Sequence, residues 1–367
     1  MLFYLTDSLI VNKDDDRYND IFKCVRNLTI AADECQHELM GDIHVLEHWK
    51  GLFANDPCRA VLLNLINNFS TTSVPSYITE YVEIVLENPQ NRSYGPDGNS
   101  KIYQLTYDNF ISCESALATH LIGEFDYDSQ FYGHILNWYK TYKNISANTN
   151  YIPVGGGGNS TSHTFKAHID RKHISVCIVD NDKRYHGASD GKTATDCRNV
   201  PCMSPLSRLK VIDVLEIENL IPKDIIDSLT WNNGHQENKT AFDGLYDNIP
   251  DKNNLRYVDL KLGYTKHQNF SQDSQWVSFV KYCCECNPEL SDEIRNNFDY
   301  VFNNAADEVR FMPRLSKTLL KDSLHFLDTH PGYNPTSLLP FQLHEWRELG
   351  QITLNTCICR NSETLNI

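Results

Sequence analysis

Acidic residues follow apolar segments at three places in this sequence, and carboxylates in such positions can bind metal ions. The residues concerned are Glu124, Asp128, Asp180, Asp182 and Glu218. The carboxyl ends of parallel strands meet at one edge of an α/β sheet, so acids that follow different strands can converge there on a divalent cation. The order of these acids along the chain therefore indicates a metal-binding edge.

Each of these acids also has a structural explanation. Residues two apart in a strand face the same way, so Asp180 and Asp182 can offer two oxygens to one cation, but turns after strands also favour aspartate. Asp128 lies near the start of a predicted helix, where the helix dipole alone favours a carboxylate. The metal-site interpretation depends on the whole set of acids rather than on any one of them.

Apolar runs alternate with helical stripes from Ala116 onward, which predicts βαβ units and a parallel sheet. We expect strands at residues 117–123, 151–154, 174–179 and 209–217. A helix should follow the first strand, with Phe131 and Trp138 on its apolar face. A second helix should run from a cap at residues 159–161 to about Ile169.

The regions on either side of this core show mainly helical spacing, as at Tyr18, Ile21 and Val25. The polar segment 183–207 reads as a loop over the sheet edge. We therefore predict an α/β fold with a parallel-sheet core and helical flanks. The expected divisions are a mainly helical region at 1–110, the α/β core at 111–222 and a mainly helical region at 223–367.

Four consecutive glycines, Gly155 to Gly158, follow the second predicted strand. They can form a flexible turn, or they can let backbone amides approach a phosphate without a Cβ in the way. The run matches neither the full dinucleotide-binding fingerprint nor a nucleotide-binding P-loop, and no ATPase motif occurs in the chain. Both interpretations of the run stay open.

Composition limits the classes of function. The chain has 367 residues, 41% of them hydrophobic, and a formal net charge of −15, which argues against nucleic-acid binding through a basic surface. Any such contact should be local or assisted by cations. We see no signal peptide and no apolar run of the ~20 residues that a membrane span needs, so we expect a cytoplasmic protein with no membrane contact. The spacing of the twelve cysteines does not favour a structural Zn²⁺ site.

The order of the acids resembles that of a Toprim (topoisomerase-primase) domain over roughly residues 115–222. The matching segments are Gly123-Glu124-x-x-x-Asp128, the glycine-rich turn, Val179-Asp180-x-Asp182 and Glu216-x-Glu218-Asn219. More narrowly, the pattern resembles overcoming-lysogenisation-defect nucleases and the standalone Toprim effectors of bacterial anti-phage systems.

The resemblance implies a phosphodiester nuclease that depends on two Mg²⁺ or Mn²⁺ ions. It implies that Glu124, Asp180 and Asp182 are catalytic and bind metal, and that Asp128 and Glu218 complete the metal sites. Such an ion pair can neutralise phosphate oxygens and activate water. Basic side chains near this edge could hold substrate phosphates, namely Lys183, Arg184, Lys192 and Lys210. No other cofactor-binding residue is expected.

The resemblance further implies an anti-phage effector restrained by a regulatory protein partner, with an ATPase sensor supplied by another polypeptide. The substrate is RNA, with transfer RNA as one target, or DNA, and the residues do not separate these. A homo-oligomer stays open. The chain has Phe125 where the family has glycine after its glutamate. The alternative is therefore a non-catalytic Toprim-like binding or scaffold subunit of a defence complex.

Overall fold

The computed structural model has a mixed α/β fold and divides into two compact units. It describes residues 1–68, 74–94, 100–202, 204–231, 233–266, 271–304, 306, 309–312 and 314–360. Unit 1 comprises Met1–Ile178, Cys197–Lys210 and Glu348–Ile367. Unit 2 comprises Val179–Asp196 and Val211–Arg347.

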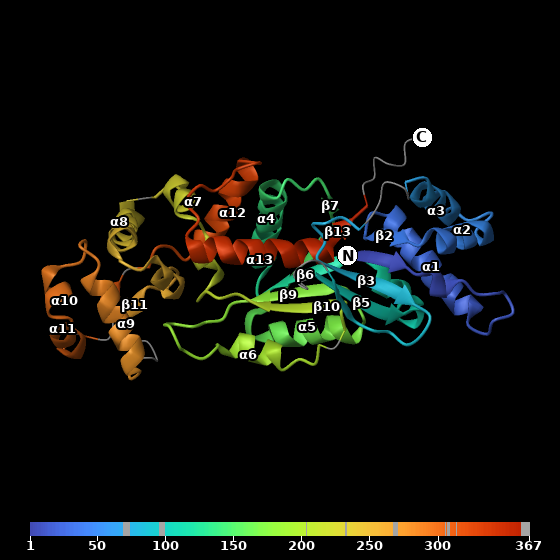
Figure 1. The fold of residues 1–367 in the computed structure, drawn as a ribbon. Coiled ribbons are helices and arrows are strands. Elements are labelled where there is room, and N and C mark those ends of the chain that lie inside the picture. Colours follow the sequence, from blue (N-terminus) through green and yellow to red (C-terminus); the bar gives the residue numbers. More distant parts are fainter. Residues whose placement is uncertain are drawn as a thin grey trace. The chain divides into compact units, whose positions relative to one another are not determined.

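The first sheet of unit 1 has the strand order β2-β1-β3-β5-β4. Its strands are β1 (Leu2–Leu5), β2 (Glu38–Gly41), β3 (Glu80–Val85), β4 (Arg92–Tyr94) and β5 (Ser100–Thr106). All neighbouring pairs are parallel except β4 with β5. Three helices accompany this sheet, namely α1 (Tyr18–Asp33), α2 (Ile43–Leu52) and α3 (Cys58–Asn67) (Figure 1).

The prediction of a mainly helical N-terminal region is therefore wrong in part. The helix over Tyr18, Ile21 and Val25 is present as α1, but β1 and β3 were not expected. β1 is a short apolar run without the alternation of a half-exposed strand, and Glu80 and Glu83 interrupt the apolar residues of β3. Periodicity alone does not distinguish such runs from buried helix.

The second sheet of unit 1 contains the four strands expected from the sequence. They are β6 (Thr119–Gly123), β8 (Tyr151–Gly155), β9 (Ser175–Val179) and β10 (Ser207–Val211), in the order β10-β9-β6-β8, and all are parallel. The fourth strand ends earlier than predicted, because Ile217 begins a 3-10 helix, η6 (Ile217–Leu220). The chain places β8 on one side of β6 and β9 on the other side. The boundary between β6 and β9 is therefore a topological switch point, and open α/β sheets bind ligands at such points.

Two helices of unit 1 lie on opposite sides of the second sheet (Figure 1). The first is α4 (Asp126–Tyr142), which packs on β6 and β8 with Phe131 and Ile135 fully buried. The second is α5 (Thr161–Asp170), which buries Phe165. A short antiparallel pair joins β7 (Asn148–Thr149) to β13 (Ile358–Cys359). The sheet is thus covered on both faces, as parallel sheets usually are.

Unit 2 is mainly helical. Its helices include α7 (Lys223–Ser228), α8 (Asn233–Asn248), α9 (Ser274–Glu285), α10 (Asp292–Asn296), α11 (Phe298–Asn304) and α12 (Leu319–Thr329). The strands β11 (Tyr264–Thr265) and β12 (Arg310–Met312) form an antiparallel pair. Ser291 caps α10, where its side chain accepts a hydrogen bond from the Ile294 amide.

Two further helices have bounds that cross the division between the units. These are α6 (Lys192–Arg198) and α13 (Pro340–Cys357). The helix α6 falls inside segment 183–207, which the sequence suggested was a loop, and its few apolar residues give too weak a stripe to be recognised.

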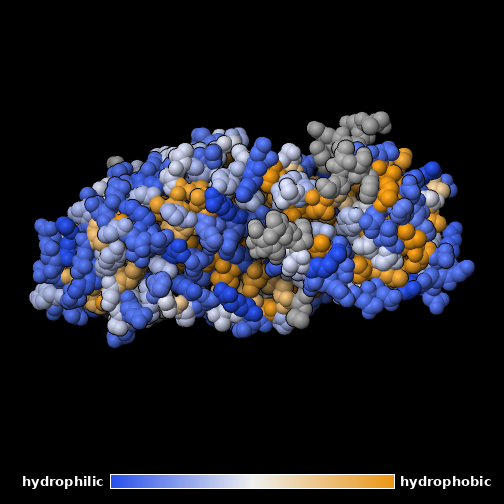
Figure 2. Space-filling model, in the orientation of Figure 1, coloured by the Kyte–Doolittle hydropathy of each residue, from blue (hydrophilic) through white to orange (hydrophobic). Residues whose placement is uncertain are grey.

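None of the helices within the described residues is long and apolar enough to cross a membrane. Hydrophilic residues cover much of the face shown in Figure 2, with hydrophobic residues in smaller clusters between them.

Candidate metal site

Five acids of unit 2 interact electrostatically with the Lys261 ammonium group, and two of them, Glu216 and Glu218, lie 3.8 and 3.0 Å from it. The members of this carboxylate cluster are Asp180, Asp182, Glu216, Glu218 and Asp259. Two of them, Glu218 and Asp259, are 3% exposed. Lys261 and Arg184 pair with these two carboxylates, and the excess of acids over cations makes the cluster a candidate cation site.

The loop that begins at Asp180 places the first two acids. The strand β9 ends at Val179, and Asp182 has a left-handed backbone with φ of 56°. The Asn181 side chain accepts a hydrogen bond from the Lys183 amide at 2.9 Å, which closes the turn. Strand alternation therefore does not orient Asp180 and Asp182, contrary to the argument from the sequence.

The 3-10 helix η6 places the next two acids. Glu216 caps this helix: its carbonyl oxygen accepts from the Asn219 amide at 2.9 Å, and the Asn219 side chain accepts from the Glu216 amide at 3.0 Å. Lys261 Nζ lies 3.0 Å from Glu218 Oε1 and 3.8 Å from Glu216 Oε1. The second carboxylate oxygen of each glutamate, Oε2, is buried and has no hydrogen-bond partner among the described residues.

Asn219 links the two glutamates to the segment that carries Asp259 and Lys261. Its side-chain amide donates to the carbonyl oxygens of Leu255 at 2.9 Å and Val258 at 2.8 Å. Both contacts are buried, so they fix this segment beside η6. The Asp259 carboxylate accepts from the Leu262 amide at 2.6 Å, which orients it within its own turn.

The electrostatics of the cluster show more negative charge than its cations compensate. Burial raises the pKa of Glu216 to about 8, and Asp259, Glu218 and Asp182 add to the shift while Lys261 opposes it. The pKa values of Asp182 and Asp259 are also raised, chiefly by loss of hydration. Carboxylates held close together hinder one another's ionisation in this way, and a bound cation relieves the repulsion.

Lys261 responds in the opposite direction. Burial alone would lower the pKa of its ammonium group, but Glu218, Glu216 and Asp180 raise it above the ordinary value. The ammonium therefore stays charged and acts as an internal counter-ion. Arg184 is a second cation here, at 3.8 Å from Asp259.

The donor set suits a hard divalent cation. Carboxylate oxygens are the ligands that Mg²⁺ and Mn²⁺ prefer, and the two orphaned Oε2 atoms supply unused acceptors. Because Lys261 already pairs with Glu218, an ion that binds Glu218 through Oε1 would have to displace the ammonium group. Among the described residues, no three of these acids place one oxygen each within 4.8 Å of one another. An ion here would therefore have to draw the carboxylates together and compete with Lys261.

The acids Glu124 and Asp128 belong to unit 1. Glu124 directly follows β6, and its negative charge contributes to raising the pKa of the buried Cys177 thiol, after the larger effects of Cys197 and of burial. The Asp128 carboxylate accepts from the Phe125 amide at 2.8 Å, and the Asp128 amide donates to the Phe125 carbonyl at 3.1 Å, so Asp128 has a structural role at the start of α4. That these two acids share metal ions with Asp180, Asp182 and Glu218 stays a prediction.

The glycine run is a hydrogen-bonded turn in unit 1. The amide of Gly156 donates to the Gly123 carbonyl at 2.8 Å, and those of Gly157 and Gly158 donate to the Glu124 carbonyl at 2.9 and 3.0 Å. A Cβ atom at residue 155 would lie 2.3 Å from Asp126 Oδ1, so the Asp126 side chain leaves room only for glycine at this position. These amides are engaged within the chain, which favours the turn over the phosphate-binding interpretation.

Three of the four basic residues proposed to bind phosphate are engaged in ion pairs. Lys183 pairs with Asp190 at 3.2 Å, Arg184 with Asp259, and Lys210 of unit 1 with Glu348. Lys192 is exposed at the start of α6. A phosphate would therefore compete with internal carboxylates at three of these positions.

The comparisons with known proteins do not identify a family. No protein-family model, no curated protein and no solved structure matches this chain.

Sequence reasoning missed Asp259 and Lys261. They lie in segment 258–263, just beyond η7 (Lys252–Tyr257), in a region expected to be helical. Their contact with Glu216 and Glu218 depends on hydrogen bonds from Asn219 to distant carbonyl groups. No local spacing in the sequence signals such a contact.

Proposed function

We propose that the chain is a Toprim-like, metal-dependent phosphodiester nuclease whose ions bind at the carboxylate cluster of unit 2. The observation that carries the proposal is the buried Glu218, whose Oε2 lacks a hydrogen-bond partner among the described residues, beside Glu216, Asp180 and Asp182. Mg²⁺ or Mn²⁺ bound there would neutralise phosphate oxygens and activate water. Glu124 and Asp128 are further ligands on the evidence of the sequence pattern.

The residues of the chain have separate tasks in this proposal. Asp180, Asp182 and Glu218 bind the ions, and Glu216, with its pKa of about 8, can hold or release a proton near neutral pH. Lys261 leaves Glu218 when an ion binds and is then available to a phosphate oxygen. Glu124 keeps the role that the resemblance implies, as a ligand or a general acid or base.

Calorimetric titration with Mn²⁺ tests the metal site. The wild-type chain should bind the ion, and the Asp180→Asn/Asp182→Asn and Glu218→Gln variants should bind it at least about tenfold more weakly. Asp247→Asn, which changes an exposed acid of unit 2 outside the cluster, is the matched control and should bind as wild type does. Equal binding by all four chains would refute the site.

Cleavage in cells tests the nuclease and its substrate. RNA and DNA ends should be sequenced from cells that express the chain and from cells that express Glu124→Ala or Glu218→Gln. If new ends appear with the wild-type chain but with neither variant, the pool that contains them identifies the substrate as RNA or as DNA. If neither pool gains ends while Mn²⁺ still binds, the chain is a metal-binding protein without nuclease activity.

The alternative is a non-catalytic scaffold subunit, and one observation favours it. The Phe125 side chain is 58% exposed next to Glu124, which is unusual for a large apolar residue and suits contact with a protein partner. Phe125→Gly separates the two functions. Under the nuclease proposal its cleavage is equal to or faster than wild type, whereas a scaffold would lose partner binding and show no cleavage with either residue.

The proposed anti-phage role requires restraint by a partner, because an unrestrained nuclease would damage its host. Expression of the chain should then be less toxic in cells that also contain the partner, including any ATPase sensor, than in cells without the partner. Toxicity that is the same in both backgrounds would remove the regulatory part of the proposal and leave the nuclease part intact.

A further inference from the structure

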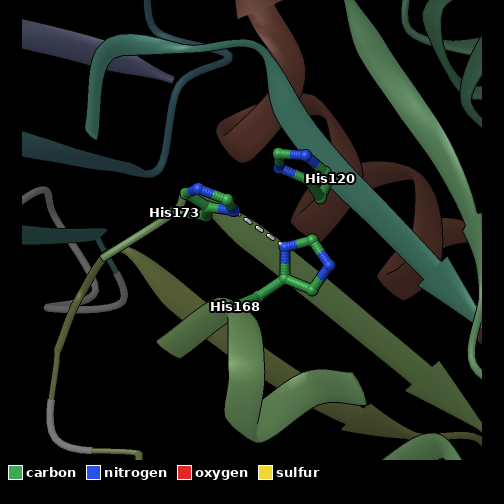
Figure 3. A group of neighbouring side chains, drawn as sticks. All are labelled: His120, His168 and His173. Carbon is green, nitrogen blue, oxygen red and sulfur yellow. Dashed lines mark hydrogen bonds between the residues drawn. The ribbon is translucent and has the colours of Figure 1, made fainter. Parts of the chain in front are cut away.

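Three histidines meet in unit 1, beneath the second sheet (Figure 3). His120 is the second residue of β6, His168 lies near the C-terminal end of α5, and His173 precedes β9. One ring nitrogen from each of the three lies within 4.8 Å of the other two. His168 and His173 have four residues between them, a spacing that zinc ligands use, whereas His120 is distant in the sequence. This pair was not predicted from the sequence, and only the fold brings His120 to it.

The three rings form a close group. His168 Nδ1 and His173 Nδ1 are 3.1 Å apart, and the ring centroids of His120 lie 4.4 Å from His168 and 4.9 Å from His173. Figure 3 shows His168 rising from its helix toward His173, with His120 above both. His120 Nδ1 is buried and has no hydrogen-bond partner among the described residues.

We propose that His120, His168 and His173 bind one divalent transition-metal ion, with Zn²⁺ as the preferred ion and a fourth position open to water. The geometry suits this ion. With Zn–N bonds of about 2.0–2.1 Å, two ligands of a tetrahedral site lie roughly 3.3 Å apart. The separation of 3.1 Å between the two Nδ1 atoms is close to that value.

The protonation of the rings supports the geometry. Burial lowers the pKa of all three, and that of His168 falls to about 4 with further effects from His120, His173 and Arg171. Glu114 opposes the shift at His173 but does not reverse it. Neutral imidazoles at pH 7 keep a lone pair for a metal, and imidazole ligands select Zn²⁺, Cu²⁺ or Ni²⁺ over Mg²⁺.

The competing explanation is that the rings are simply packed. The His120 and His173 rings are nearly parallel, with an interplanar angle of 10°, and the two Nδ1 atoms could share one proton in a hydrogen bond. Packing alone leaves the buried His120 Nδ1 without a partner, which has a cost of about 1–3 kcal/mol. A metal ion engages one nitrogen of every ring and removes that cost.

The site is separate from the proposed nuclease site. His120 and His173 lie at the amino-terminal ends of β6 and β9, while Glu124 follows the carboxyl end of β6. An ion here would join α5 to two strands of the sheet. The inference therefore predicts a structural ion of unit 1 and does not depend on nuclease activity.

Co²⁺ and Zn²⁺ are the probes for this site. Metal-free full-length chain, titrated with Co²⁺ in excess Mg²⁺, should develop the intense visible bands of a tetrahedral nitrogen site at one equivalent, and Zn²⁺ should displace them. An ion on the carboxylates would give only weak octahedral bands. The double variant His120→Gln/His168→Gln should bind Co²⁺ and Zn²⁺ at least about 100-fold more weakly. Loss of residues that only orient metal ligands costs about 10–100-fold, and this variant removes two ligands themselves.

The control is His163→Gln, which changes an exposed histidine of the same helix and should leave the spectrum unchanged. X-ray absorption of the Zn²⁺-loaded wild-type chain does not depend on the folding of any variant. It should show three imidazole nitrogens at about 2.0 Å. Absence of a tetrahedral Co²⁺ spectrum, fewer than three imidazoles, or wild-type affinity in the folded double variant would each overturn the proposal.

Discussion

At the scale of single residues, Lys261 decides how the carboxylate cluster is balanced. Its ammonium group pairs with Glu218 at 3.0 Å and approaches Glu216, in a site where two carboxylate oxygens lack hydrogen bonds to described residues. A partly buried lysine with several acids is an internal substitute for a metal ion. The same carboxylates then serve either the lysine or an ion, and the two cations compete.

Replacing Lys261 by methionine tests this competition. The variant keeps the aliphatic volume and removes the charge, so Mn²⁺ should bind at least about tenfold more tightly, which corresponds to about 1.4 kcal/mol. Calorimetry near pH 8 gives the affinity directly. Unchanged or weaker Mn²⁺ binding in a folded variant would show that the ammonium does not occupy the ion's position.

The pKa of Glu216 predicts how stability depends on pH in the metal-free chain. In the folded state its pKa is about 8, above the ordinary 4.5, because burial and the neighbouring Asp259, Glu218 and Asp182 disfavour the charge, with Lys261 opposing. Between these values the folded state holds one proton more than the unfolded state. The stability from Glu216 is therefore complete below about pH 4.5 and is lost as pH rises through 8, at up to about 1.4 kcal/mol per pH unit.

Urea unfolding in EDTA across this range measures that slope. Glu216→Gln carries no titrating proton, so its slope should be flatter than that of wild type by about the contribution of one group. Parallel pH profiles for the two chains would contradict the assignment of the shift to Glu216.

At the scale of elements, the 3-10 helix η6 and the segment after η7 form the site through Asn219. This one side chain caps η6 and binds two carbonyl oxygens of the other segment. The elements that carry Glu218 and Lys261 are thus joined by an amide that is 3% exposed. Their relative position should be sensitive to that residue.

Asn219→Ala should lower the free energy of unfolding by about 2 kcal/mol, because it leaves buried backbone groups without partners. Metal affinity should fall with it, since Glu218 is no longer held beside Lys261 and Asp259. Thermal unfolding and Mn²⁺ calorimetry provide the two readouts. Asn304→Ala, which removes one exposed hydrogen bond to the Tyr300 carbonyl, should change neither quantity appreciably.

Some elements of this fold could be predicted from the sequence and others could not. The second sheet was predictable because its central strands, β6 and β9, are apolar runs. The first sheet was missed because β1 is an apolar run of only four residues and Glu80 and Glu83 interrupt the apolar residues of β3. The pairing of Lys261 with Glu218 and the approach of His120 to His168 and His173 arise from contacts between distant segments, which no local pattern encodes.

At the scale of the whole molecule, the net charge of −15 limits how a nucleic acid can approach. A polyanion gains little from the surface as a whole, and three of the four basic residues considered already pair with acids. Divalent ions at the carboxylate cluster would supply the missing positive charge. Substrate binding should therefore depend on the ion as well as on the protein.

Binding of single-stranded RNA and DNA should be weak in EDTA and at least about tenfold tighter with Ca²⁺, which occupies oxygen sites and often does not support cleavage. Fluorescence anisotropy at fixed ionic strength measures both states. Glu218→Gln should lose the enhancement by Ca²⁺. Tight binding without divalent ions would instead place the nucleic-acid surface away from the cluster.

The backbone of Asp182 has a consequence for selection of variants. Its left-handed conformation, with φ of 56°, costs about 1 kcal/mol for a residue other than glycine. Glycine at this position would relax the loop and make the protein more robust to heat, while it would delete a carboxylate from the cluster. A screen for thermostability alone would therefore favour chains that lack this carboxylate.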